Sequence, residues 1–227
     1  MSALNAVITE DGRLLIGCDG ALWQYQPDGT LHAFGTTNAK FWRLRRGPIY
    51  VGARGAWAIA KPLAFGFILA PWLDLAARPE RLARFLSIYL RWLTLVREPP
   101  PDRREVHVVV AGWDRRRRCM FVHEFSAKSR AAGFVVERHS DGAAIGPYDP
   151  ELDHLVAPQT VSAMARLLAA QCTMMTRWGA PEGGLPYHVV EVEPGGRVTR
   201  HVIRELPTPS PMAAFAPHMV SGGRGLG

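Results

Sequence analysis

Residues 7–19 read VITEDGRLLIGCD, and this stretch decides the fold of the chain. Two apolar runs, Ala6–Thr9 and Arg13–Cys18, lie on either side of Glu10-Asp11-Gly12. Apolar runs joined by a short segment that contains Asp-Gly are typical of a β-hairpin. An acidic residue, Asp19, follows the second run directly. The sequence therefore predicts an opening hairpin that ends in a carboxylate.

The same pattern of two apolar runs around a turn recurs along the chain. We expect further hairpins from Leu22–Tyr25 with Leu31–Phe34, Phe41–Leu44 with Ile49–Gly52, Glu105–Ala111 with Cys119–Phe125, Phe134–Glu137 with Ala143–Ile145, and Tyr187–Glu193 with Arg197–Arg204. Several of these strands become continuously apolar, as in HVVVA. Such strands indicate antiparallel sheets that are covered on both faces.

Three helices are expected between the hairpins. The first covers about Ala56–Leu69, where Lys61 and Pro62 favour a buried helix over a membrane span. The second begins near Pro79 and ends before a run of three prolines, and the third covers Val161–Trp178 behind the N-cap Thr160. Because helices and strands do not alternate, a doubly wound parallel sheet is disfavoured. The sequence predicts an α+β fold of two packed antiparallel sheets flanked by helices.

Composition sets the class of the protein without naming a partner. The chain has 227 residues, of which 48% are hydrophobic, enough for a packed core. Its net charge is +7, but the arginines are scattered along the sequence, which favours a soluble basic surface over nucleic-acid binding. The three cysteines, Cys18, Cys119 and Cys172, are too few and too widely spaced for a disulfide framework. A reducing, cytoplasmic location fits this usage.

The order of elements and five local stretches resemble a proteasome β-type subunit, a member of the N-terminal-nucleophile (Ntn) hydrolase superfamily. The stretches are VITEDGRLLIGCD, NAKFWRL, IYVGARGAWA, VVVAGWDRRRRCMFVHEF and AAIGPYD. The resemblance covers Ser2 to Leu206 and implies a four-layer αββα sandwich. It implies one such domain over residues 1–206, followed by a Pro/Gly-rich tail over 207–227 that we expect to be extended or disordered.

The resemblance also implies a catalytic site. Ser2 takes the place of the nucleophile once Met1 is removed, and its free amine is the base. Lys40 matches the active-site lysine, Asp19 the acidic residue that holds it, and Gly52 the glycine whose N–H stabilises the oxyanion. The implied activity is cleavage of a peptide or another amide bond. Each residue also has an ordinary interpretation, as a frayed terminus, a turn residue, a surface lysine or a tight-turn glycine.

Two departures from the family favour a second hypothesis, a catalytically inactive proteasome-like protein that assembles or docks within a larger complex. The family's Gly-Ser-Gly turn reads Gly146-Pro147-Tyr148 here, which removes a supporting serine and places a bulky ring nearby. The Asp and Ser expected after the third helix have no equivalents in RWGAPEGGLP. Fold alone does not establish activity.

We expect no cofactor and no metal, because the eight histidines lack ligand spacing. A polar cluster of Asp149, Glu151, Asp153 and His154 fits a cation site less well than a solvated loop. The resemblance implies self-association into rings and, for an active enzyme, a peptide or small amide substrate. No membrane partner is expected, and a polyanion-binding module driven by surface arginines is a third option.

Overall fold

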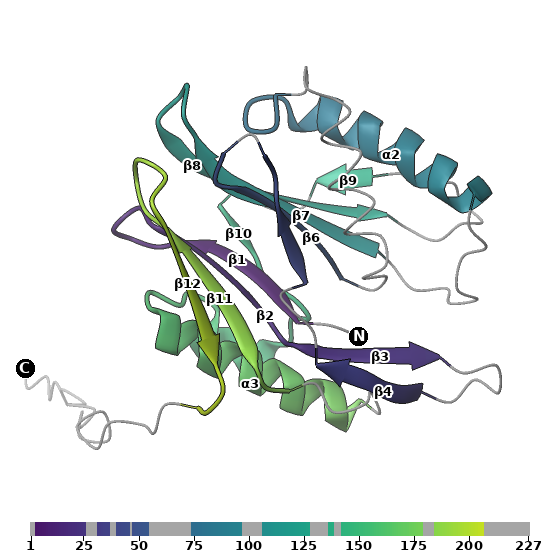
Figure 1. The fold of residues 1–227 in the computed structure, drawn as a ribbon, viewed down its shortest axis with the longest axis vertical. Helices are drawn as coiled ribbons and strands as arrows, with labels where there is room; N and C mark the ends of the chain where they lie inside the picture. Colours follow the sequence, from purple (N-terminus) through teal and green to yellow (C-terminus); the bar gives the residue numbers. More distant parts are fainter. Residues whose placement is uncertain are drawn as a thin grey trace, which may run out of the picture.

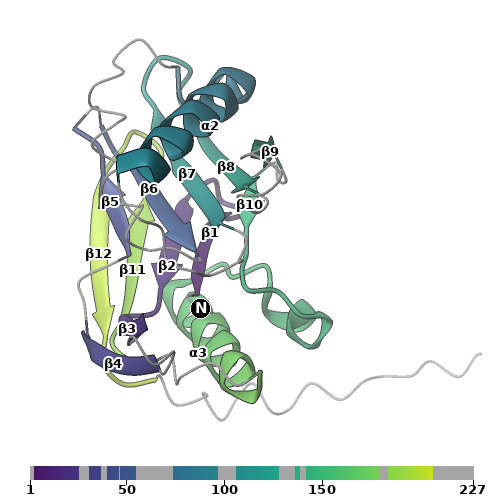
Figure 2. The ribbon, with the colours of Figure 1, turned by 90° about the vertical axis from the view of Figure 1, so that its right-hand side faces the viewer.

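The computed structural model describes residues 3–25, 31–36, 40–45, 47–54, 74–96, 106–127, 136–138, 142–178 and 184–206. Two five-stranded antiparallel sheets lie one over the other in this part of the chain, and a helix covers the outer face of each (Figure 1). Figure 2 shows the same order of layers after a quarter turn, with α2 (Pro79–Val96) and α3 (Val161–Arg177) at opposite ends. The predicted α+β sandwich is confirmed.

The first sheet has the strand order β10-β1-β2-β11-β12. The opening hairpin is present as predicted, with Leu4 opposite Cys18 and Ile8 opposite Leu14. Gly12 adopts a φ of 79° in its turn, a conformation that favours glycine. The strands are β1 (Leu4–Ile8), β2 (Leu14–Cys18), β10 (Ala143–Ala144), β11 (Tyr187–Val192) and β12 (Val198–Ile203).

The second sheet has the strand order β5-β6-β7-β8-β9. Its centre is the long hairpin of β7 and β8, in which Val110 lies opposite His123. The strands are β5 (Phe41–Arg43), β6 (Ile49–Arg54), β7 (Val106–Asp114), β8 (Cys119–Ala127) and β9 (Val136–Arg138). A separate two-stranded sheet pairs β3 (Ala21–Tyr25) with β4 (Leu31–Thr36).

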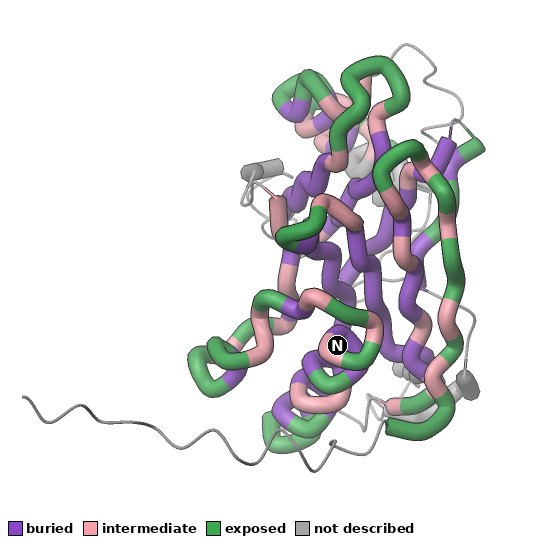
Figure 3. The backbone as a smooth tube through the Cα atoms, turned by 90° about the vertical axis from the view of Figure 1, so that its left-hand side faces the viewer, coloured by how far each residue is buried: buried purple, intermediate pink, exposed green. Residues whose placement is uncertain are grey.

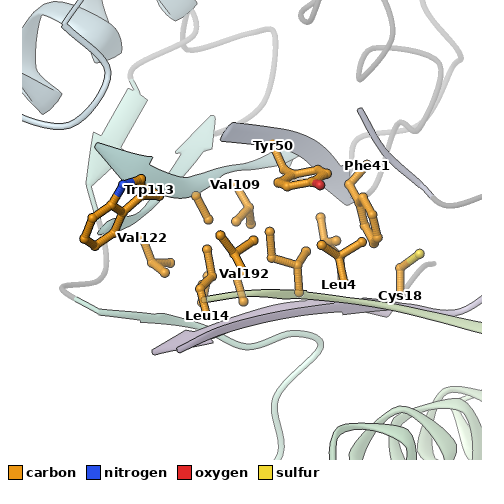
Figure 4. Close-up of a cluster of buried hydrophobic side chains, with 14 residues drawn as sticks. Leu4, Leu14, Cys18, Phe41, Tyr50, Val109, Trp113, Val122 and Val192 are labelled. Carbon is orange, nitrogen blue, oxygen red and sulfur yellow. The ribbon is translucent and has the colours of Figure 1, made fainter. Parts of the chain in front are cut away.

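Side chains of alternating direction build three apolar layers. Along β2, Leu14 and Ile16 face the second sheet, whereas Leu15 faces α3. Figure 3 shows the result: the strands at the centre are buried, and exposed residues gather at turns. Figure 4 shows the layer between the sheets, where Leu4 and Leu14 lie across from Tyr50 and Val109. Each fully buried side chain of this size contributes about 1.5–3 kcal/mol.

Both described helices follow from their sequence patterns. In α2, Leu82 and Leu86 are spaced four residues apart and pack on Val110 and Phe125 of the second sheet. In α3, the Thr160 side chain accepts a hydrogen bond from the Ala163 N–H, as expected for an N-cap. The predicted helix over 56–69 and the predicted tail over 207–227 lie outside the described residues.

One predicted hairpin is wrong. Phe134–Glu137 and Ala143–Ile145 were expected to pair with each other, but β9 pairs with β8 and β10 pairs with β1. The two segments therefore belong to different sheets, and the chain crosses from one layer to the other between them. Local turn residues predict a reversal of the chain, but they do not predict which strand will pair with each segment.

Candidate active site

A buried ion pair joins the two sheets at one end of the sandwich. Asp19 follows the last residue of β2, and Lys40 precedes the first residue of β5. The Lys40 Nζ lies 2.6 Å from the Asp19 Oδ2, and the two side chains are only 2% and 1% exposed. A single buried charge would be strongly destabilising, so each of these residues requires the other. The structure thus brings together two of the four predicted site residues, which are 21 positions apart in sequence.

The second carboxylate oxygen of Asp19 fixes the amino-terminal end of the described chain. The backbone N–H of Ala3 donates to Asp19 Oδ1 over 2.8 Å, and the Asp19 N–H donates to the Ala3 carbonyl over 3.3 Å. Asp19 therefore connects Ala3 to the Lys40 ammonium. Ser2 lies outside the described residues, and it is the residue that directly precedes Ala3.

Gly52 lies on β6, opposite Phe41 of β5, the residue that directly follows Lys40. A Cβ atom on Gly52 would be 2.7 Å from the Leu4 Cδ2 and 3.3 Å from the Lys40 carbonyl oxygen. Only glycine allows β6 to approach Leu4 this closely. The structure therefore places three predicted residues, Asp19, Lys40 and Gly52, around the start of β1.

Neutral sulfur and phenol groups surround the ion pair. The Lys40 N–H donates to the Cys18 Sγ over 3.2 Å, and burial raises the pKa of Cys18 to about 12. Burial also raises the pKa of Cys172 on α3 to about 12 and raises the pKa of Tyr187 on β11. These groups stay protonated near neutral pH and add no charge. Asp19 and Lys40 thus face each other in surroundings of low polarity, where their attraction is strong.

A network of side-chain amides closes the other side of the β1 start. The Leu4 N–H donates to the Gly146 carbonyl over 3.0 Å, and the Gly146 N–H donates to the Asn5 Oδ1 over 3.0 Å. Asn5 and Gln171 of α3 exchange two hydrogen bonds of 2.7 and 3.0 Å. Gln171 also donates to the Pro147 carbonyl over 2.9 Å. Both amide residues are fully buried.

Asn5 and Gln171 were not among the residues predicted for the site. A signal was present, because each is a polar residue at a position where the strand or helix pattern is otherwise apolar. Buried amides at such positions need partners, and these two satisfy each other across 166 residues of sequence. The network holds the Gly146-Pro147 turn against β1.

Tyr148 differs from the sequence expectation. Its ring was expected to enter the site, but the side chain is 52% exposed and its hydroxyl donates to Asp153 over 2.5 Å. In the region after α3, Trp178 is 48% exposed, and residues 179–183 lie outside the described residues. The bulky residue of the turn therefore projects away from the buried ion pair.

The acidic residues after this turn belong to a short 3-10 helix, η3 (Pro150–Leu155). Asp149 caps it by accepting from the Glu151 N–H, Asp153 accepts from Tyr148, and Glu151 pairs with Arg177 over 3.1 Å. Within the described ranges, no three His, Cys, Asp or Glu side chains gather as metal ligands would. In the same residues, no helix is long and apolar enough to span a membrane.

The comparison with solved structures agrees with this architecture. The fold is similar to that of the Gly-1 mutant of Anbu from Hyphomicrobium sp. strain MC1, with a TM-score of 0.57 and 16% identity. The match covers 90% of this chain and 87% of the Anbu chain. At this identity the likeness is one of fold alone: a sandwich of two antiparallel sheets with helices, shared over nearly the whole length of both chains. No family model and no curated protein matches the sequence.

Proposed function

We propose that the chain is a proteasome-like Ntn hydrolase that cleaves a peptide or another amide bond with Ser2, after removal of Met1. One observation carries the proposal: Asp19 binds the Lys40 ammonium with one oxygen and the Ala3 N–H with the other. The residue that directly follows Ser2 is therefore anchored to a buried, charge-balanced pair. A buried carboxylate needs a partner for each oxygen, and here the second partner is the amino-terminal segment itself.

The proposed chemistry follows from these groups. The Ser2 hydroxyl attacks the carbonyl carbon of the substrate, and its proton passes to the α-amine of the same residue. An α-amine ordinarily has a pKa of about 7.7–8.0, so part of the population is neutral near physiological pH and can accept the proton. The positive charge of Lys40 disfavours protonation of the amine and favours the developing alkoxide. Asp19 holds Lys40 in place.

The attack forms a tetrahedral intermediate, which then breaks down to an acyl-enzyme and the leaving amine. A backbone N–H at Gly52 is the proposed donor to the tetrahedral oxyanion, a contribution of about 3 kcal/mol to transition-state stabilisation. The C–N bond of the substrate breaks, and the leaving nitrogen takes the proton held by the α-amine. Water attacks the remaining ester and releases the acid, which regenerates the Ser2 hydroxyl.

Two measurements test this proposal. Intact mass and N-terminal sequencing should show a chain that lacks Met1, because a retained Met1 leaves no free α-amine at Ser2. A peptide bearing an electrophile that captures a hydroxyl and an amine together should add one adduct per chain. Ser2→Ala and Lys40→Met should abolish the adduct, whereas the exposed control Ser162→Ala should keep it. A processed chain that forms no adduct would refute the enzyme.

The second candidate is a catalytically inactive proteasome-like assembly protein. The amide network of Asn5 and Gln171 favours it, because it fills with side-chain amides the place where the family's pattern has a supporting serine. On this hypothesis the Asp19–Lys40 pair serves stability alone. Retention of Met1 in the purified protein, together with a ring-sized particle in solution, is the result that distinguishes it.

Self-association into rings is the proposed assembly under both candidates, and the proteasome-like fold supports it. Light scattering or native mass spectrometry of the purified chain measures it directly. A monomer at micromolar concentration would refute ring assembly and leave the catalytic test unaffected.

A further inference from the structure

The fold gathers arginines that are scattered in the sequence. One group lies at the turn between β7 and β8, where residues 115–118 are all arginine and all exposed. A second group lies at the beginning of α2, where Arg78, Arg81 and Arg84 are exposed. Thirty residues of sequence, 85–114, separate the two groups.

Arg117 ties the two groups together. Its guanidinium donates to Asp74, four residues before Arg78, over 2.8 and 3.2 Å, and to Asp114 of β7 over 2.6 Å. This fork fastens the β7–β8 turn to the segment that leads into α2. Arg117 carries one positive charge against these two carboxylates, and among the described residues neither carboxylate pairs with another arginine of the turn.

Six arginine side chains around this tether have no ion pair or hydrogen bond within the part of the chain that the structure describes. The first turn of α2 also contains one acidic residue, Glu80. We call this set the arginine face; its members are Arg78, Arg81, Arg84, Arg115, Arg116 and Arg118. Such an unbalanced patch attracts a polyanion.

The arginine face continues along α2 into apolar residues. Arg81, Arg84, Ile88 and Trp92 are spaced by three, four and four positions, so they share one side of the helix. Ile88 is 70% exposed and Trp92 is 51% exposed. The Trp92 ring lies 5.6 Å from Tyr89, which in turn stacks on Phe85 at 5.6 Å, so these contacts support it from within the helix. From Arg81 to Trp92 the stripe is about 16 Å long.

We propose that the arginine face and Trp92 bind single-stranded nucleic acid, with arginines on the phosphates and the indole on a base. The planar guanidinium matches phosphate oxygens in pairs, and an exposed, supported aromatic ring stacks on any base. A linear stripe with a charged part and an aromatic part fits a strand that offers a phosphate and a base at every step. The arginines are scattered along the sequence, which favoured a basic surface without nucleic-acid binding. In the fold, the contact of Arg117 with Asp74 brings two of these arginine groups together.

The test uses the full-length protein and a fluorescent 20-mer of thymidylate, with binding followed by anisotropy between 50 and 200 mM salt. Six phosphate contacts predict a loss of affinity of about 300-fold over this range, from a slope of about 0.7 per contact for a single strand. The variant Arg78→Ser/Arg81→Ser/Arg84→Ser should reduce the slope of log K against log salt by about two. Trp92→Leu should weaken binding about fivefold or more and leave the slope unchanged.

A matched control removes the same charge from another face. Arg166→Ser/Arg177→Ser/Arg204→Ser changes exposed arginines on α3 and after β12, and it should leave binding within about twofold of wild type. An equal loss in this control would overturn the proposal, because net charge would then explain binding. No binding at 50 mM salt would also overturn it, as would equal competition by poly-L-glutamate, which would assign the face to acidic proteins.

Discussion

Replacing Lys40 with methionine is the most informative perturbation of the buried core. Methionine keeps most of the length of the side chain and removes the charge together with the N–H donors of the ammonium. The Asp19 carboxylate, 1% exposed, then retains a single described partner besides the lost ammonium, the Ala3 N–H at 2.8 Å. Breaking a buried pair by removing one partner costs about 3–5 kcal/mol. Because whole domains are stable by about 5–15 kcal/mol, this is a large share of the total.

The magnitude follows from how deeply the pair is buried. Both side chains are more than nine-tenths covered, so water cannot take over the contact that the 2.6 Å ion pair provides. For a chain of this size, the loss corresponds to a fall in Tm of about 6 to 20 °C. Urea unfolding followed by tryptophan fluorescence measures the free-energy change, and thermal unfolding gives the Tm.

A double-mutant cycle separates the missing partner from lost packing. Asp19→Asn keeps an amide oxygen that can accept from Ala3, and Asp19→Asn/Lys40→Met leaves no unpaired charge. The double variant should therefore be more stable than Lys40→Met, with a coupling energy of about 2 kcal/mol or more. Arg204→Met, at an exposed position, should change stability by less than about 0.5 kcal/mol. A cost below about 1 kcal/mol for Lys40→Met, or additive effects in the cycle, would refute the reasoning.

Three further outcomes follow from particular contacts. Gln171→Leu should lower the free energy of unfolding, measured in urea, by about 2–4 kcal/mol, because Asn5 and the Pro147 carbonyl both lose their hydrogen bonds to Gln171. Thr173→Ala, at an exposed position of the same helix, should lower it far less. Gly52→Ala should lower the free energy of unfolding by about 1–3 kcal/mol, because the new methyl group would lie 2.7 Å from the Leu4 Cδ2. Gly184→Ala, whose methyl group has no neighbour within 4 Å, should change it little. Equal losses in the two variants would contradict the close approach of β6 to Leu4. With a thiol reagent at pH 8, the native protein should react at one cysteine, the exposed Cys119, because burial raises the pKa of Cys18 and Cys172 to about 12 and keeps both thiols protonated. In urea, all three cysteines of the unfolded chain should react. Fast reaction of all three in the native protein would contradict the burial of Cys18 and Cys172.

Much of the fold was predictable because its signals are local. The Asp-Gly turn and the apolar runs around it specify the opening hairpin, and the Thr160 cap with its following apolar stripe specifies α3. The partners of β9 and β10 were not predictable in this way. Their pairing depends on which strands of two sheets lie nearby, and a short apolar run carries no record of that choice.

For the site, the sequence by itself determined which residue types are present: the carboxylate of Asp19 at the end of a strand, Lys40 as the only lysine before Ile49, and Gly52 within an apolar strand. Only the tertiary structure decided that Asp19, Lys40 and Ala3 meet, that Asn5 and Gln171 satisfy each other, and that arginines from two distant segments share one face. The physical reason is the same in each case. Propensity and periodicity act over a few residues, whereas a buried charge or amide is tolerated only where the packed chain supplies its partner, and that partner can come from any position in the sequence.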